Sequence, residues 1–236
     1  MANPEQLSAL LQGPEAWNRW RAANPQMRAD FRGADFSGMD LSGADLQGSN
    51  LMGASLRGAD LAGVDLGRSK LVSADLRSAK LRGADISEAK FGGAKLAGAD
   101  LTSAKLVKAD LAGADLRSLS MTGADLRGAT LTGADLSGSD LREAKMRGAD
   151  LRMARLVGSE LMGADLSRAK LVRSKLAGAD LRGSSLFEAD LSGADLTRAD
   201  LSGADLTGSD LSRAVLRSAK LNGAILEGVR GMEMGI

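Results

Sequence analysis

The sequence predicts an all-β solenoid, in which the chain winds into stacked turns around an apolar column. Three observations lead to this prediction. An apolar residue recurs every five positions from Phe31 to Leu226, a small residue usually stands two positions before it, and a polar residue usually lies between the two. The 40 units follow one another without an insertion. A short unit repeated over most of a chain is typical of an architecture in which each unit packs only against its neighbours.

A period of five residues fits neither a straight helix nor a flat strand. On an α-helix, successive unit centres would be rotated by about 140° and would leave no apolar stripe. On a flat strand, side chains alternate between the two faces, so successive centres would point in opposite directions. We therefore expect each unit to run extended over the small, polar and apolar residues and then to turn.

The composition of the unit indicates which side chains are buried. Leu or Ile occupies 35 of the 40 centres, and Ala occupies 30 of the 40 positions two residues earlier. The residue between them is Asp in 22 units and Lys in nine. Glycine stands two residues after the centre in 25 units, at the expected corner, where a positive φ suits it. Leucine and alanine should therefore fill the column, while charged side chains should face solvent.

The units resemble those of a known repeat family. Stretches such as Ala34-Asp35-Phe36-Ser37-Gly38 and Ala44-Asp45-Leu46-Gln47-Gly48 are similar to the Ala-(Asp/Asn)-Leu-x-x unit of the pentapeptide repeat family, and the resemblance extends over residues 29–228. One departure is that Asn occurs in the second position only at Asn50. The resemblance implies a right-handed quadrilateral β-helix with four units per coil, hence about ten coils. It also implies a function, because some members resemble duplex DNA, bind DNA gyrase and protect it from poisons.

Residues 1–28 precede the repeat and predict a helical cap on its first coil, where an uncovered edge would invite polymerisation. Asn3, Pro4 and Gln6 are typical of an N-cap, a first helical residue and a capping-box partner. A second short helix is expected over residues 14–22.

The second predicted helix carries two tryptophans, Trp17 and Trp20, which lie three residues apart and therefore on one helix face. The first coil in turn has two bulky centres, Phe31 and Phe36. We interpret these rings as a cover for the first coil. The alternative is that the tryptophans form a patch for a binding partner.

The C-terminal tail, residues 229–236, is too short to form a domain. It could lie across the last coil, or it could leave that coil open so that two copies meet end to end around a two-fold axis. We predict the homodimer through the C-terminal coil.

One unit in the middle of the repeat carries large side chains at both buried positions, Leu119 and Met121. Overpacking a tight core costs about 1–3 kcal/mol unless the backbone adjusts. The unit predicts either a local bulge or a simple drift of the repeat.

The composition excludes several kinds of chemistry. The chain has no cysteine, histidine or tyrosine, which rules out disulfides, metal sites built on cysteine or histidine, and histidine-based triads. Its glycines do not form a phosphate-binding loop, and its aspartates do not follow a calcium-binding repeat. We therefore expect no enzymatic activity, no cofactor and no metal.

The charge and hydropathy also limit location and partners. With 31 basic and 30 acidic residues, the net charge of +1 predicts no direct binding of nucleic acid. No leader peptide and no membrane-spanning stretch is visible, so a cytoplasmic location is expected.

The faces of a four-sided coil can be read from residues that lie 20 apart. On one face this reading gives an acidic stripe of Asp140, Glu160, Asp180 and Asp200, beside Arg142 and Arg182. The stripe is a candidate interaction surface or else a solvated face, and at one charge per ~4.8 Å it is a sparse imitation of duplex DNA, which carries one per ~1.7 Å. Phe187, predicted to point into solvent, is a second candidate.

We predict a non-enzymatic protein-binding rod, and the family resemblance points to DNA gyrase or another type II topoisomerase as its partner. The alternative is a structural spacer or self-assembly module without a role at a topoisomerase.

Overall fold

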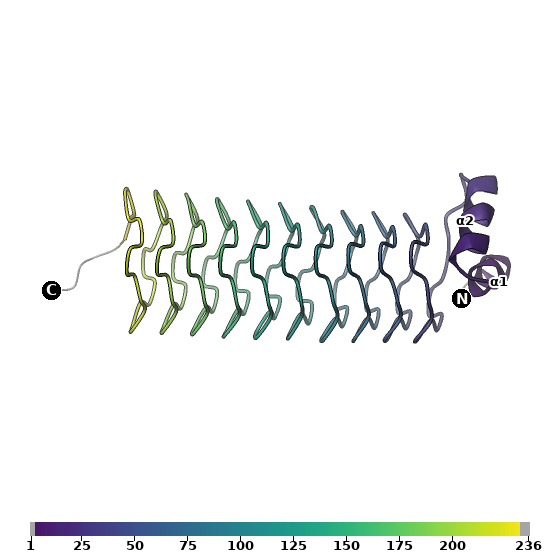
Figure 1. Ribbon diagram of the computed structural model, residues 1–236, viewed down its shortest axis with the longest axis horizontal. Coiled ribbons are helices and arrows are strands. Elements are labelled where there is room, and N and C mark those ends of the chain that lie inside the picture. The colour runs from purple at the N-terminus through teal and green to yellow at the C-terminus, as the bar shows by residue number, and fades with distance from the viewer. Residues whose placement is uncertain (1–2, 232–236) are drawn as a thin grey trace.

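The computed structural model describes residues 3–231 and shows a rod of stacked turns (Figure 1). Two helices, α1 (Pro4–Leu11) and α2 (Pro14–Ala23), precede the rod and lie together at one end of it. The last described turn lies at the opposite end. The predicted tail, residues 229–236, falls mostly outside the described residues. Neither of the two helices has the length and apolar character that crossing a membrane requires.

Parallel β-bridges between residues that are 20 apart hold the turns together. The first bridge joins Asp30 to Asn50, and the last joins Asp210 to Arg230. Because the unit is five residues long, this separation places four units in each turn. The register agrees with the four-sided coil that the family resemblance implies.

Most units make the same kinds of backbone hydrogen bond. The N–H of Leu56 donates to the carbonyl of Asp75 in the next turn over 2.7 Å, and Asp75 donates back to the carbonyl of Ala54 over 2.9 Å. Within the corner, Ala59 donates to the carbonyl of Leu56 over 3.1 Å. The backbone is therefore hydrogen-bonded between turns without any long strand.

The column inside the turns is filled by the residues that the repeat predicts. The centres Leu96, Leu136 and Leu176 have no exposed surface, and the alanines and serines two positions before the centres are buried with them through most of the rod. Removing this apolar surface from water is the main stabilising contribution, at about 25 cal/mol per Å².

The residue two positions after each centre is left-handed whether or not it is glycine. Gly33 has a φ of 66°, and Arg173 has a φ of 55° in the equivalent place. A left-handed conformation costs a non-glycine residue about 1–2 kcal/mol, so the stacked fold imposes the corner. The aspartate before the centre supports this corner, since the carboxylate of Asp35 accepts the N–H of Ser37 over 2.9 Å.

The irregular unit at Leu119 opens its corner but keeps its register. The N–H of Leu119 donates to the hydroxyl of Ser139 over 3.2 Å, and that hydroxyl donates to the carbonyl of Leu116 over 2.6 Å. A buried serine of the next turn thus stands where other units make a direct backbone bond. The bridge between Ser120 and Asp140 is retained, so the distortion is local.

The first turn of the rod is hydrogen-bonded to α1. The side chain of Asn3 accepts the N–H groups of Glu5 and Gln6, as expected of an N-cap. The expectation that Gln6 completes a capping box is wrong. Its side chain is buried and accepts the N–H of Asp30 over 2.8 Å, because docking α1 on the rod offers it an unpaired edge. The N–H of Asn3 donates to the carbonyl of the same Asp30.

Candidate functional site

The four carboxylates of the acidic stripe stack on one side of the rod. Bridges join Asp140 to Glu160, Glu160 to Asp180, and Asp180 to Asp200. The structure therefore brings these four residues together in successive turns.

Arg142 lies against the first two carboxylates of the stripe. Its Nε and Nη2 atoms donate to the carboxylate of Asp140 over 2.9 and 2.6 Å, and its Nε lies 3.4 Å from Glu160. The hydrogen bonds from Arg142 lower the pKa of Asp140 to about 2. The carboxylate is thus ionised at neutral pH, but its charge is matched by a guanidinium in direct contact.

The other two carboxylates of the stripe also have basic partners. Arg182 Nη2 lies 2.6 Å from Asp180, and Lys220 Nζ lies 3.2 Å from Asp200. Paired charges produce a weak field at a distance, and salt screens it further. The stripe therefore differs from duplex DNA, whose phosphates form a dense row of one sign.

Phe187 does not extend the acidic stripe. It follows Leu186 at a corner of another side, and its side chain is half-buried, whereas the sequence predicted that it points into solvent. Its carbonyl accepts the N–H of Arg168 over 2.8 Å. The two candidate surfaces from the sequence are separate in the structure.

The aromatic residues at the N-terminal end form one cluster. Trp17 has no exposed surface; its ring lies 5.1 Å from that of Trp20 and 5.3 Å from that of Phe31, which in turn meets Phe36 at 5.4 Å. The indole N–H of Trp17 donates to the carbonyl of Asp45 over 2.6 Å. Trp17 thus covers the first turn and is hydrogen-bonded to it, while Trp20 stays half-buried.

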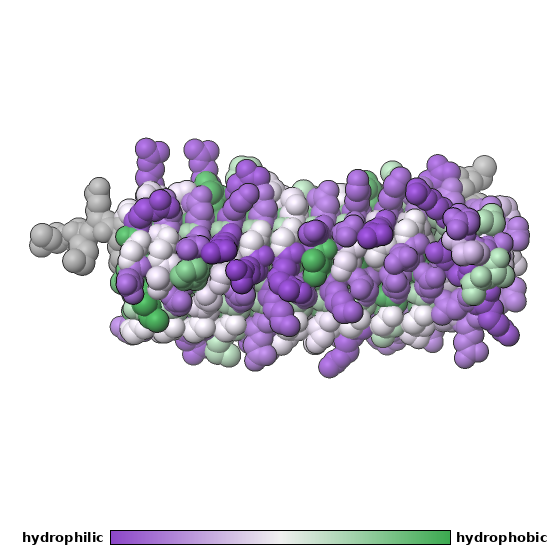
Figure 2. Space-filling model, turned by 90° about the horizontal axis from the view of Figure 1, so that it is seen from above, coloured by the Kyte–Doolittle hydropathy of each residue, from purple (hydrophilic) through white to green (hydrophobic). Residues whose placement is uncertain are grey.

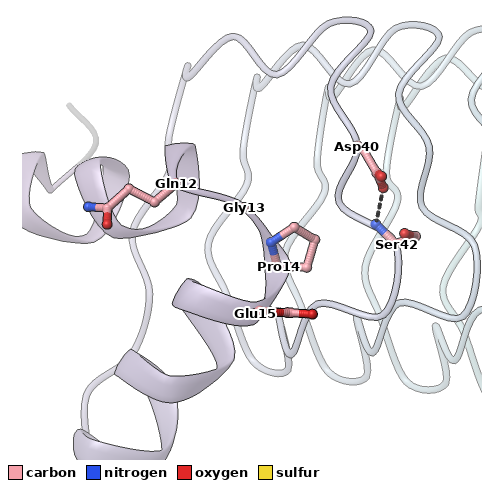
Figure 3. A pocket seen from close by; sticks show the side chains of 6 residues that line it. All are labelled: Gln12, Gly13, Pro14, Glu15, Asp40 and Ser42. Atoms are coloured by element: carbon pink, nitrogen blue, oxygen red, sulfur yellow. Dashed lines mark hydrogen bonds between the residues drawn. The ribbon is translucent and has the colours of Figure 1, made fainter.

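A hollow of about 380 Å³ opens beside the junction of α1 and α2 (Figure 3). It is lined by Gln12, Gly13, Pro14, Glu15, Asp40 and Ser42. The carboxylate of Asp40 accepts the N–H of Ser42, and Figure 3 shows Gln12 pointing away from that pair. The polar groups do not converge, and within residues 3–231 no cluster of three acidic side chains could hold a metal ion.

The C-terminal end of the rod exposes apolar side chains. Val215 is 47% exposed, Ile225 52% and Leu226 37%, although a centre such as Leu226 is fully buried elsewhere in the rod. The N–H groups of the last centres, Leu216, Leu221 and Leu226, have no backbone acceptor among residues 3–231. Figure 2 shows apolar side chains near this end, whereas along the rod they stand singly between hydrophilic ones.

One side of the C-terminal half carries a concentration of positive charge. Bridges align Arg155, Lys175, Asp195 and Val215 along it. Together with its two corners, this side covers residues 152–158, 172–178, 192–198 and 212–218, in which Asp195 is the one acidic residue. We call it the basic face; its exposed basic residues are Arg152, Arg155, Arg173, Lys175, Arg198, Arg213 and Arg217.

The sequence pattern did not reveal the basic face. Stepping by 20 residues compares one place in the unit with the same place in the next turn, and this finds a stripe such as Asp140 to Asp200. The basic residues occupy different places in the unit: Lys175 precedes a centre, Arg217 follows one directly, and Arg173 stands at the corner. Only the folded geometry shows that they share a side.

These features define a β-helical solenoid protein with four-sided turns. The family model described as pentapeptide repeats matches in eight copies, over residues 29–68, 59–96, 94–133, 124–163, 164–203 and 194–230. The chain therefore belongs to the pentapeptide repeat family, and its fold is the right-handed quadrilateral β-helix of that family.

Several solved structures are similar to the chain. HetL from the cyanobacterium Nostoc sp. strain PCC 7120, a pentapeptide repeat protein involved in the regulation of heterocyst differentiation, is 37% identical over 90% of this chain and 92% of HetL, with a TM-score of 0.53. A pentapeptide repeat protein of the Arabidopsis thaliana thylakoid lumen is 34% identical over 45% of this chain and 71% of its own, with a TM-score of 0.40. QnrB1, a plasmid-mediated fluoroquinolone resistance protein, is 19% identical over 83% and 92%, with a TM-score of 0.37. The comparison with curated proteins finds no match.

Proposed function

We propose that the protein is a non-enzymatic rod of about ten coils that binds other proteins along its sides and joins a second copy through its last turn. The observation that carries the proposal is the contrast between polar sides and an apolar end at Val215, Ile225 and Leu226. Exposed apolar residues beside unpaired backbone groups are the features of a surface that is covered by another chain.

A dimer with its two-fold axis at the last turn would cover the exposed apolar side chains of this end and provide partners for its backbone groups. It places the same residues of two copies against each other, so that Leu226 and Ile225 are buried on both sides. It also brings together two backbone edges that have no partner among residues 3–231. Such contacts close after two copies, which avoids open-ended polymers.

The mass of the protein in solution tests the dimer. We expect light scattering to give twice the 24.3 kDa of one chain, and Leu226→Asp to return the mass to that of one chain. Met27→Asp is the matched control, because Met27 is 43% exposed at the other end and its replacement should leave the dimer intact. A wild-type protein that is monomeric at all concentrations would refute the dimer.

The proposal takes different forms, depending on which protein, if any, binds along the sides of the rod. The likeness to HetL, a protein involved in regulation, supports a rod that acts by binding a regulatory partner. Binding of DNA gyrase or another type II topoisomerase is the form that the family resemblance suggests, and it requires a cytoplasmic location. A spacer or self-assembly module needs only the end contact.

A supercoiling assay separates these forms. Purified gyrase is assayed with and without a quinolone over a wide range of concentrations of the protein. Protection or inhibition would support the topoisomerase form, and unchanged activity throughout would exclude it. A dimer that leaves gyrase unaffected would favour a regulatory partner or the self-assembly module.

A further inference from the structure

The basic face has more positive charge than its own carboxylates can match. Two of its seven basic residues are paired, since Arg152 Nη2 lies 2.6 Å from Asp150 and Arg155 Nε lies 3.3 Å from Asp135. The other five have no carboxylate at ion-pairing distance in the part of the chain that the structure describes; they are Arg173, Lys175, Arg198, Arg213 and Arg217. These five cations lie in three successive turns, about 5 Å apart along the rod, where like charges repel.

Apolar side chains are interspersed with these cations. Met153 is 58% exposed and Val157 is 36% exposed, and both lie at the corners of the basic face. A face that mixes arginine with exposed methionine and valine has the composition of a protein-binding surface.

A hollow of about 340 Å³ marks the corner of the basic face. It is lined by Val172, Arg173, Ser192, Gly193, Ser212 and Arg213. Gly193 lies between the two arginines, and a Cβ added there would lie 3.4 Å from Cγ of Arg173. The hollow is therefore lined by two arginines and two serines around a glycine, a set of residues that suits a carboxylate.

The same surface is poorly suited to nucleic acid. Single strands bind through aromatic side chains on which bases stack, and three of the four phenylalanines are buried in the column while Phe187 lies at a corner between two other sides. Non-specific binding to duplex DNA depends mainly on phosphate contacts, to which Met153 and Val157 contribute nothing. Acidic protein segments provide both carboxylates and apolar side chains.

We propose that the basic face is the docking surface for an acidic segment of a partner protein, with carboxylates on the unpaired arginines and apolar side chains on Met153 and Val157. This inference rests on the proposed function as a protein-binding rod and specifies the chemistry of its partner. The hollow between Arg173 and Arg213 receives one carboxylate of that segment.

Fluorescence anisotropy with a defined probe tests the proposal on the full chain. The probe is a labelled peptide built from glutamate and leucine. A peptide with glutamine in place of glutamate, and single-stranded and duplex oligonucleotides of equal charge, serve as comparison ligands. We expect the acidic peptide to bind best, and its affinity to fall as salt rises to about 0.5 M, since the contacts are exposed charges.

Two triple variants of equal charge change locate the binding surface. The test variant is Arg173→Ser, Lys175→Ser, Arg198→Ser, and the control variant on the opposite side is Lys108→Ser, Lys145→Ser, Arg147→Ser. All six side chains are exposed, and serine occupies equivalent places elsewhere, as in Ser73 and Ser120, so both variants should fold. We expect the test variant to lose about tenfold in affinity for the acidic peptide and the control variant to lose less than about twofold.

The outcomes distinguish this proposal from its alternatives. Equal losses in both variants, no binding by the wild type at low salt, or tighter binding of an oligonucleotide than of the peptide would each overturn it. The mass of each variant is measured in parallel. Peptide binding by a protein that is monomeric and leaves gyrase unaffected would support the basic face while refuting the dimer and the topoisomerase partner.

Discussion

At the N-terminal end of the rod, side chains of the two helices bind the exposed edge of the first turn. Asn18 accepts the N–H of Asp45 and donates to the carbonyl of Gly43, and Trp17 donates to the carbonyl of Asp45. At the C-terminal end, the described residues provide no such partners for the last turn, and Leu226 is partly exposed. Within the described residues, the same repeat therefore has one covered end and one uncovered end.

This difference shows that the repeat cannot terminate itself. Every coil offers its edge to a following coil, so an end needs a sequence that does not repeat. The N-terminal helices supply one, with polar side chains for the backbone and aromatic rings for Phe31 and Phe36. In the proposed dimer, the second copy lies against the end that the described residues leave uncovered.

The largest effect is expected from Trp17→Ala at the covered end. The substitution removes a fully buried ring and its hydrogen bond to Asp45, and large aromatic truncations in cores cost about 3–5 kcal/mol. We expect this loss in the free energy of unfolding, measured with urea. Trp20→Ala, at a half-buried ring, should cost clearly less, and equal costs would contradict the account of the cap.

A second comparison uses the same substitution in the middle and at the open end. Leu136→Ala should lower the free energy of unfolding by about 2–5 kcal/mol, because Leu136 has no exposed surface. Leu226→Ala should cost less than about 1 kcal/mol in the monomer, measured at low protein concentration, since Leu226 is already partly exposed. Similar costs at both sites would show that the last turn is covered.

Asn18→Ala should have an intermediate effect at the covered end. It leaves the N–H of Asp45 and the carbonyl of Gly43 without their side-chain partner, at a cost of about 1–2 kcal/mol. Hydrogen exchange should show the loss in the first turn and not at Leu136. A loss spread evenly over the rod would mean that the cap is not a local structure.

Acid should loosen the two ends unequally, with the smallest effect of the series. Hydrogen bonds from Arg32, Ser37 and Ser42 lower the pKa values of three first-turn carboxylates, which are those of Asp30, Asp35 and Asp40. Their ionised forms therefore stabilise the folded state above the unfolded pKa of about 4, and this stabilisation is lost as the pH falls towards the folded values.

The last turn has Val215, Lys220, Ile225 and Arg230 in the equivalent places, so it lacks this dependence. Amide exchange compared above and below about pH 4 should therefore change more in the first turn than in the last. Because the chain has no histidine, stability should be constant between about pH 5 and 8. A transition in that range would contradict this reasoning.

Much of the fold could be predicted from the sequence because one steric pattern recurs in every unit. Leucine and alanine at fixed spacing identify the column, and glycine identifies the corner. Gln6 could not be predicted, because its partner Asp30 becomes available only when α1 docks. The corner at Leu119 depends on a serine 20 residues later, which no local rule relates to it.

The surfaces were harder to predict than the interior because charge pairing depends on side-chain reach. A row of carboxylates such as Asp140 to Asp200 is visible in the sequence, but its neutralisation depends on how Arg142 folds back on its own unit. The basic face depends on residues from both corners of a side. Burial repeats with the backbone, whereas surface charge does not.

The length of the particle in solution tests the contrast between the two ends most directly. Small-angle scattering of the wild type should give a maximum dimension about twice that of Leu226→Asp, because two rods that meet at their last turns lie end to end. A dimer with the length of one rod would place the contact on a side. A wild type with the length and mass of Leu226→Asp at every concentration would show that the C-terminal end needs no partner.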